Sequence, residues 1–150
     1  MIKLSGQDIR ELYTMRSALE RLAARLVAEQ IDADKEIAIN DALDCLRQEA
    51  QGGEWVRIAD ADFSFHKKIV DLSGNARLMA QYGMLDAQIR MYIRAFSGMF
   101  TNFDEIMAPH EAIAAAIISG DKLRAGQLSE DHNLVDGNVL ERHIAKLTTA

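Results

Sequence analysis

The chain of 150 residues is long enough for one domain with a core of its own. Its net charge of −6 and its lack of a lysine and arginine cluster argue against direct binding of DNA or RNA. No apolar run approaches the roughly twenty residues that span a membrane. A Gly-rich phosphate loop and a nucleophile elbow are also missing, which argues against nucleotide hydrolysis and triad-type acyl transfer.

The composition favours helices and a reducing compartment. Aromatic residues make up 6% of the chain, there is one proline, and Ala, Leu, Ile and Met abound. The single cysteine, Cys45, cannot form an internal disulfide. Because no signal peptide is recognisable either, we expect a cytoplasmic protein.

The first two predicted helices span residues of about 7–29 and 34–51. Ser5 stands at the N-cap position of the first helix, and Gly52 and Gly53 end the second. An apolar stripe with helical spacing runs along the first helix and predicts its buried face. The members of this stripe are Leu12, Met15, Leu19, Leu22 and Leu26.

The third predicted helix, at about 54–72, has two polar residues on its apolar face. Asp62 and His66 share the stripe of Ile58, Phe65 and Ile69, so both are expected to point inward. The two residues lie one helical turn apart, which lets their side chains meet at one point.

A turn leads to the fourth predicted helix, at about 76–99, which has the longest apolar stripe in the chain. Gly74 is expected to take the left-handed conformation, and Asn75 to cap the new helix. Arg90 and Arg94 lie off the stripe and are expected at the surface. The members of the stripe are Leu78, Tyr82, Leu85, Ile89, Tyr92, Phe96 and Met99.

The last two predicted helices, at about 105–119 and 122–147, each have one inward histidine, His110 and His132. Pro109 is expected in the first turn of the fifth helix or at a kink just before His110. Gly126 and Gly137 are expected to weaken the sixth helix slightly. Six helices joined by short turns predict an all-α antiparallel bundle.

The four inward polar residues, Asp62, His66, His110 and His132, indicate a metal site inside this bundle. Burying such groups without a partner costs several kcal/mol, and one divalent cation would satisfy all four. Imidazole and carboxylate donors suit zinc, nickel, manganese or iron. The alternative at each position is a hydrogen-bonded core residue without a metal.

Three stretches of the chain resemble the FCD domain, the effector-binding C-terminal half of FadR-subfamily GntR transcription regulators. The segments DFSFHKKI at 62–69 and SGNARL at 73–78 resemble its signature D-x-x-F-H-x-x-I…S/T-G-N-x-x-L. The segment HEAIAAAIISGD at 110–121 is followed by Ala125 and His132, as in the family's second motif. The segment LYTMRSALE at 12–20 matches its opening L-Y-x-x-R-x-x-L-E.

The resemblance implies a FadR C-terminal-domain-like bundle in which Asp62, His66, His110 and His132 bind a divalent metal, often zinc or nickel. It also implies a small organic acid effector that completes the metal's coordination, with Arg16 facing the pocket. The alternative for Arg16 is a salt bridge with Glu20 on the same helix.

Tyr82 and Tyr92 are further candidates for effector binding, since both are expected to face the bundle interior. Their alternative role is ordinary core packing.

The resemblance also implies a homodimer, with residues 1–150 forming a single domain. The family binds DNA through an N-terminal winged-helix domain that this chain lacks. Apolar residues outside the main stripes of the first and fourth helices are expected to be exposed and to form the dimer interface. They are Ala18, Ala23, Met91 and Ile93.

The sequence therefore favours a metal-dependent sensing and dimerisation domain of a GntR-family regulator that is not an enzyme. A helical-bundle metalloenzyme is the second hypothesis. We disfavour it because no further inward glutamate or histidine is recognisable as a general base. The third hypothesis is a structural interaction domain without a metal.

Overall fold

The computed structural model describes residues 5–99 and 102–148. In these two ranges the chain forms six α-helices and no strand, which confirms the predicted all-α fold. The predicted bounds differ from the observed ones by two residues at most. The helices are α1 (Gly6–Glu29), α2 (Ala33–Gly52), α3 (Trp55–Leu72), α4 (Ala76–Ser97), α5 (Phe103–Ile118) and α6 (Lys122–Thr148).

The helix ends follow the local chemistry of the sequence. The Ser5 side chain accepts a hydrogen bond from the Asp8 amide at the start of α1. Gly74 has a φ of 66°, which favours glycine over other residues, and Asn75 accepts from the Leu78 amide to begin α4. These three predictions are confirmed.

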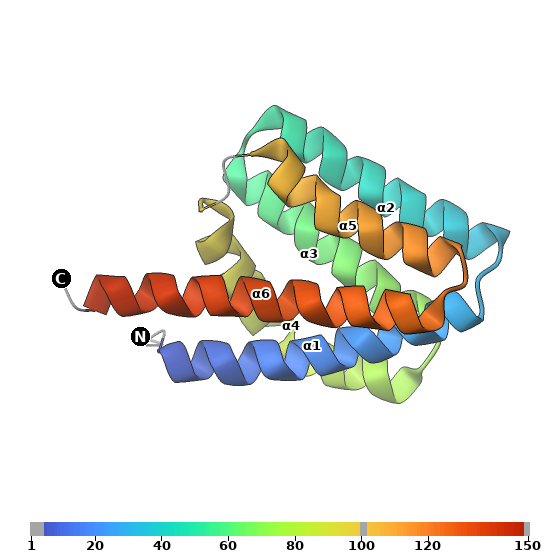
Figure 1. Ribbon diagram of the computed structural model, residues 1–150, viewed down its shortest axis with the longest axis horizontal. Coiled ribbons are helices and arrows are strands. Elements are labelled where there is room, and N and C mark those ends of the chain that lie inside the picture. Colours follow the sequence, from blue (N-terminus) through green and yellow to red (C-terminus); the bar gives the residue numbers. More distant parts are fainter. Residues whose placement is uncertain (1–4, 100–101, 149–150) are drawn as a thin grey trace.

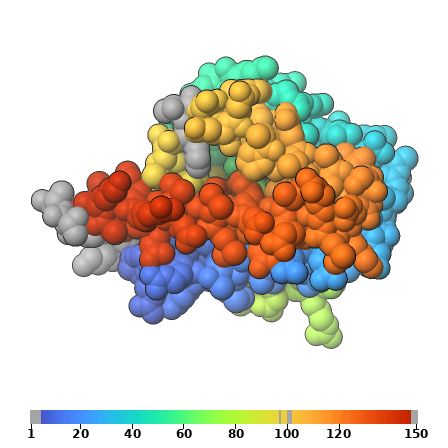
Figure 2. Space-filling view, viewed as in Figure 1, coloured from blue at the N-terminus to red at the C-terminus, as the bar shows by residue number. Residues whose placement is uncertain are grey.

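The helices form a bundle in which α1 and α6 lie side by side and run in opposite directions (Figure 1). α3 packs against α1, α2 and α4, while α5 packs against α1, α2 and α6. The space-filling view shows α6 crossing one face of the molecule, with α5 above it and α1 below (Figure 2). α1 therefore contacts α3, α4, α5 and α6.

Two glycines bring α1 and α6 into close contact. A Cβ atom on Gly137 would lie 2.7 Å from the Cβ of Tyr13, and one on Gly126 would lie 2.7 Å from the Cγ of Arg25. From the sequence, Gly126 and Gly137 were expected only to weaken the helix slightly. Their function in the fold is to let two helix backbones approach, which any larger side chain would prevent.

The predicted buried stripe of α1 is partly wrong. Met15 and Leu22 are 50% and 43% exposed, whereas Arg16 and Glu20 are almost completely buried. α1 places small and polar residues against its neighbours, and apolar spacing alone cannot identify such a face.

Three smaller expectations also need correction. Ala23 and Ile93 are buried within this chain and cannot form an exposed dimer patch, whereas Ala18 is exposed and Met91 is half-buried. Pro109 lies in the middle of α5 and not in its first turn. Its missing N–H leaves the Glu105 carbonyl without its helical donor just before His110.

Candidate metal centre

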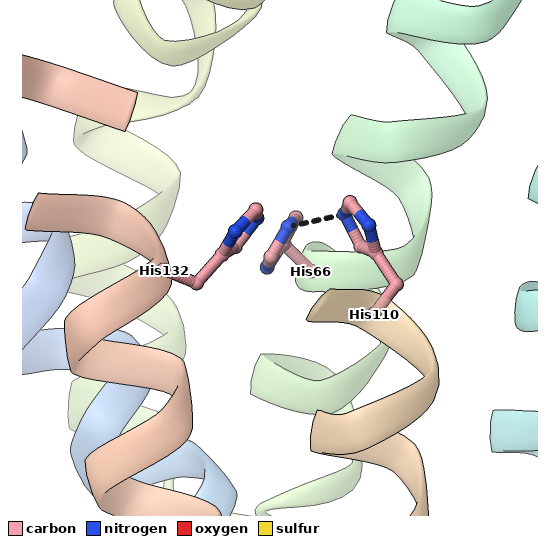
Figure 3. A group of neighbouring side chains, drawn as sticks. All are labelled: His66, His110 and His132. Carbon is pink, nitrogen blue, oxygen red and sulfur yellow. Dashed lines mark hydrogen bonds between the residues drawn. The ribbon is translucent and has the colours of Figure 1, made fainter. Parts of the chain in front are cut away.

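Three histidines from three helices meet in the middle of the bundle. His66 comes from α3, His110 from α5 and His132 from α6, and one ring nitrogen of each lies within 4.8 Å of the others. The ring centroids are 4.7 to 5.2 Å apart. Figure 3 shows the three side chains pointing toward one another. The structure thus gathers the three histidines that the sequence placed on inward faces.

Asp62 joins this histidine cluster from one turn earlier in α3. Its Oδ1 lies 3.6 Å from His66 Nε2, and its Oδ2 lies 3.3 Å from His110 Nε2. The side chain is mostly buried, with 20% of its surface exposed. Burial opposes its ionisation, but His110 and then His66 hold its pKa far below the ordinary value. All four predicted ligands therefore occupy one place.

The outer hydrogen bonds of two histidines determine which nitrogen of each ring is free. His66 Nδ1 lies 2.8 Å from Glu20 Oε2, and His110 Nδ1 lies 2.6 Å from the carbonyl oxygen of Ile106. Both oxygens are acceptors, so each Nδ1 carries a hydrogen, and each Nε2 has a lone pair when its ring is neutral.

These two lone pairs point at each other. His66 Nε2 and His110 Nε2 are only 3.1 Å apart, the contact dashed in Figure 3. It is a hydrogen bond only if one ring takes up a second proton. Otherwise two acceptors repel each other at this distance, and a shared cation would convert the repulsion into coordination.

His132 presents a third nitrogen that lacks a partner. Its Nε2 is buried and has no hydrogen bond within the described residues. Burial, together with His110 and His66, holds the pKa of His132 well below its usual value, so the ring is neutral at neutral pH. A neutral imidazole is the form that binds a metal ion through a ring nitrogen.

Glu20 of α1 contacts the cluster through His66 Nδ1. The sequence did not identify it as an inward residue. Its Oε1 accepts from Arg16 Nε at 2.7 Å and from the Tyr82 hydroxyl at 2.8 Å. Its Oε2 accepts from Asn133 Nδ2 at 2.7 Å and faces His66 Nδ1. Burial would raise the pKa of Glu20, but Arg16 and His66 hold it well below its usual value.

Asp136 is a second missed carboxylate. It lies one turn after His132, and its Oδ2 is 3.5 Å from His132 Nε2. Burial, and then the charge of Asp62, raise the pKa of Asp136 to about 7. His132 and Asp136 have the same spacing along their helix as Asp62 and His66. This spacing could have identified Asp136 from the sequence. The sequence predicted no further inward glutamate or histidine, and the buried Glu20 contradicts this expectation, whereas Asp136 was not considered.

A cavity of ≈ 420 Å³ opens beside the histidines. Asp62, His110, His132 and Asp136 line it, and its remaining walls are mostly apolar. It lies among α3, α4, α5 and α6, because its lining residues come from these four helices. A small molecule in this cavity would meet the side of the cluster where the ring nitrogens are free.

The three predicted effector-binding residues lie elsewhere. Arg16 and Tyr82 are buried behind the histidines, where both bind Glu20, and neither lines the cavity. Tyr92 lines a separate hollow of ≈ 300 Å³ between α1 and α4. Arg16 forms the salt bridge with Glu20 that the sequence offered as its alternative role, and its Nη2 has no hydrogen bond in the described part of the chain.

Comparison with known families agrees with this architecture. The FCD domain model matches residues 11–134 of the chain, a stretch that includes all three histidines and Asp62. The chain belongs to the FCD family. The resemblance found in the sequence motifs is thus confirmed.

Two relatives resemble this FCD domain. A probable D-xylose utilization operon transcriptional repressor of Paenarthrobacter nicotinovorans is 29% identical over 119 residues, which cover 79% of this chain and 52% of that protein. The McbR/YncC structure from E. coli superposes with a TM-score of 0.77 at 18% identity, covering 92% of this chain and 66% of that one. The FCD domain thus spans about half the length of the repressor.

The Paenarthrobacter relative is a probable transcriptional repressor, in agreement with the prediction that this FCD domain is not an enzyme. None of the helices in the described ranges is both long and apolar enough to cross a membrane.

Proposed function

We propose that this FCD domain is the metal-dependent, small-carboxylate-sensing and dimerisation domain of a GntR-family transcription regulator. The observation that supports a metal most strongly is the convergence of three imidazole nitrogens from three helices on one place. His66 Nε2 and His110 Nε2 face each other at 3.1 Å, and the buried His132 Nε2 has no partner in the described residues. Asp62 adds a carboxylate oxygen 3.3 Å from His110.

The charge balance around the cluster also supports a divalent cation. Glu20, Asp62 and Asp136 are mostly or fully buried, and the one buried arginine beside them is Arg16. Glu20 and Asp62 less Arg16 leave an excess of one negative charge, and Asp136, whose pKa is raised to about 7, adds a second only when it is ionised. A divalent ion would neutralise that excess, as buried charges require.

In this proposal Asp62, His66, His110 and His132 hold the ion, with zinc or nickel favoured and manganese or iron compatible with the donors. A bound ion would supply a Lewis-acidic position that attracts a carboxylate. Hydrogen bonds within the protein hold the donor nitrogens in position for the ion. Glu20 and the Ile106 carbonyl keep Nδ1 of two rings protonated, which directs both Nε2 atoms inward.

The sensing step follows from the helices that meet at the cluster. A small organic acid in the cavity would contact α3, α5 and α6 together, because Asp62, His110 and His132, which line it, come from these helices. The acid can shift the domain between two arrangements only by binding one of them more tightly. We assign Arg16 and Tyr82 an indirect role through Glu20, which they hold by hydrogen bonds.

We further propose a homodimer that uses the outer face of α1 and α4. Met15 and Leu22 on α1 and Met84 on α4 are large, exposed apolar side chains. Tyr92 lines the hollow between these helices, so in this arrangement it faces the dimer interface and not the effector. DNA would be bound in the cytoplasm by a winged-helix domain of the full regulator that lies outside these residues.

The proposed metal is tested on the purified domain by elemental analysis and thermal denaturation. We expect about one equivalent of a first-row divalent metal, a lower melting temperature after chelation, and recovery when nickel or zinc is added back. No metal by elemental analysis, together with no thermal response to added metal, would refute the proposal.

A metal-free structural domain is the competing function, and one observation favours it. The pKa of His110 is raised: although burial opposes a charge on the ring, Asp62 beside it favours one. A doubly protonated His110 would donate to His66 and satisfy the close Nε2 pair without a metal. The same experiment separates the two functions, since the melting temperature of a metal-free structural domain would not change with chelator or with added metal.

A further inference from the structure

The cavity beside the histidine cluster is built largely from apolar side chains. Ile58 of α3, Ile93 and Phe96 of α4, and Leu128 and Val139 of α6 line it. A ligand hydroxyl against these walls would lose its hydrogen bonds to water and find no replacement on the protein. The walls therefore suit the hydrocarbon part of a ligand and disfavour a polyhydroxylated one.

The charged groups of the cavity are all acidic apart from its two histidines. Asp62 and Asp136 lie beside the histidines, and Glu105 and Asp131 lie on exposed parts of α5 and α6. No lysine or arginine is among the described residues that line it. A bound divalent ion would offset one anionic group on the ligand. A second carboxylate would meet only acidic or apolar neighbours.

We infer that the effector is a monocarboxylate with an apolar body, and that the cavity rejects di- and tricarboxylates and sugar acids. This inference rests on the proposed metal-dependent function, because the ion is the positive partner that the carboxylate would bind in the cavity. A volume of ≈ 420 Å³ lies in the usual range for small-molecule sites, so an acid of modest size fits with its body against Phe96 and Ile93.

The first experiment compares acids on the nickel-loaded domain by calorimetry. The probes are hexanoate and phenylacetate against succinate, citrate and gluconate, with hexylamine as a cationic chain of similar length. We expect the two monocarboxylates to bind at least tenfold more tightly than the other four. Equal or tighter binding of citrate, succinate or gluconate, preference for hexylamine, or no binding of any probe would overturn the inference.

Metal content, measured first on the same sample, separates this failure from failure of the proposed function. If the domain retains nickel but prefers citrate, only the inference of a monocarboxylate effector is refuted. A domain that retains no nickel refutes the proposed function, and the inference with it.

The second experiment adds a cation where the cavity has none. Val135 lines the cavity yet is 59% exposed, and Asp131 is exposed one turn before it, so both tolerate substitution. Val135→Lys and Asp131→Lys should each reduce the preference for hexanoate over citrate at least fivefold. Asp41→Lys on α2, an exposed residue that does not line the cavity, serves as the control and should leave the preference unchanged. An unchanged preference in both cavity variants would contradict the acidic lining as its cause.

Discussion

The two sides of the histidine cluster are built differently. On the side of α1, Glu20 receives hydrogen bonds from Arg16, Tyr82 and Asn133 and also faces His66 Nδ1. On the side of the cavity, His132 Nε2 has no hydrogen bond within the described residues, His66 Nε2 and His110 Nε2 face each other, and carboxylates lie nearby. The difference separates a supporting side, whose contacts fix ring orientation, from a binding side left open to a ligand.

The largest effect on stability is expected from a substitution on the supporting side. In Glu20→Gln the side chain keeps its size but loses its charge, which leaves Arg16 buried without a counter-ion. Breaking such a buried pair costs about 3–5 kcal/mol, and chemical denaturation should show a loss in this range. Glu11→Gln on the exposed face of α1 is the control, with a change near zero. A loss below about 1 kcal/mol for Glu20→Gln would mean that the network does not support the cluster.

The binding side predicts the next largest effect. Replacing His66 by Ala removes one of four proposed donors, and nickel binding should weaken by about a hundredfold or more. His143→Ala is the matched control, because His143 is the one histidine outside the cluster. Competition with a chelating dye measures both affinities. Equal affinities for the two variants would show that nickel binds elsewhere.

The contact between α1 and α6 gives a third test, since it positions both the supporting side and His132. In Gly137→Ala the new methyl group would lie 2.7 Å from Tyr13 Cβ, and such overpacking costs about 1–3 kcal/mol. Gly83→Ala on α4 meets nothing within 4 Å and should stabilise the helix by about 1 kcal/mol. Opposite signs in thermal denaturation are expected. A stabilising Gly137→Ala would mean that α6 can move away from α1.

Asp136 gives the smallest effect and tests whether the binding side needs its charge. Asp136→Asn keeps the shape but removes a carboxylate beside His132, so nickel affinity should fall about tenfold, or ~1.4 kcal/mol. Asp131→Asn, an exposed position of the same helix, should change it less than about twofold. An unchanged affinity for Asp136→Asn would remove this carboxylate from the charge balance of the site.

The sequence by itself determined the six helices, several of their caps and the inward direction of His66, His110 and most of the apolar stripe of α4. These properties depend on residues within one or two turns, so local spacing and capping chemistry suffice to predict them. The inward direction of Asp62 and His132 follows in the same way. The fold class and the four candidate ligands were therefore available before any tertiary contact was known.

Only the tertiary structure decided how the helices face one another. It buried Glu20 and Arg16 while leaving Met15 exposed, because the neighbours of α1 present polar partners and glycines to it. It brought His66 and His110, 44 residues apart, to 3.1 Å. Spacing along a chain gives the phase of each helix about its own axis. Which faces meet, and which nitrogens are then left without hydrogens, depends on packing between distant segments.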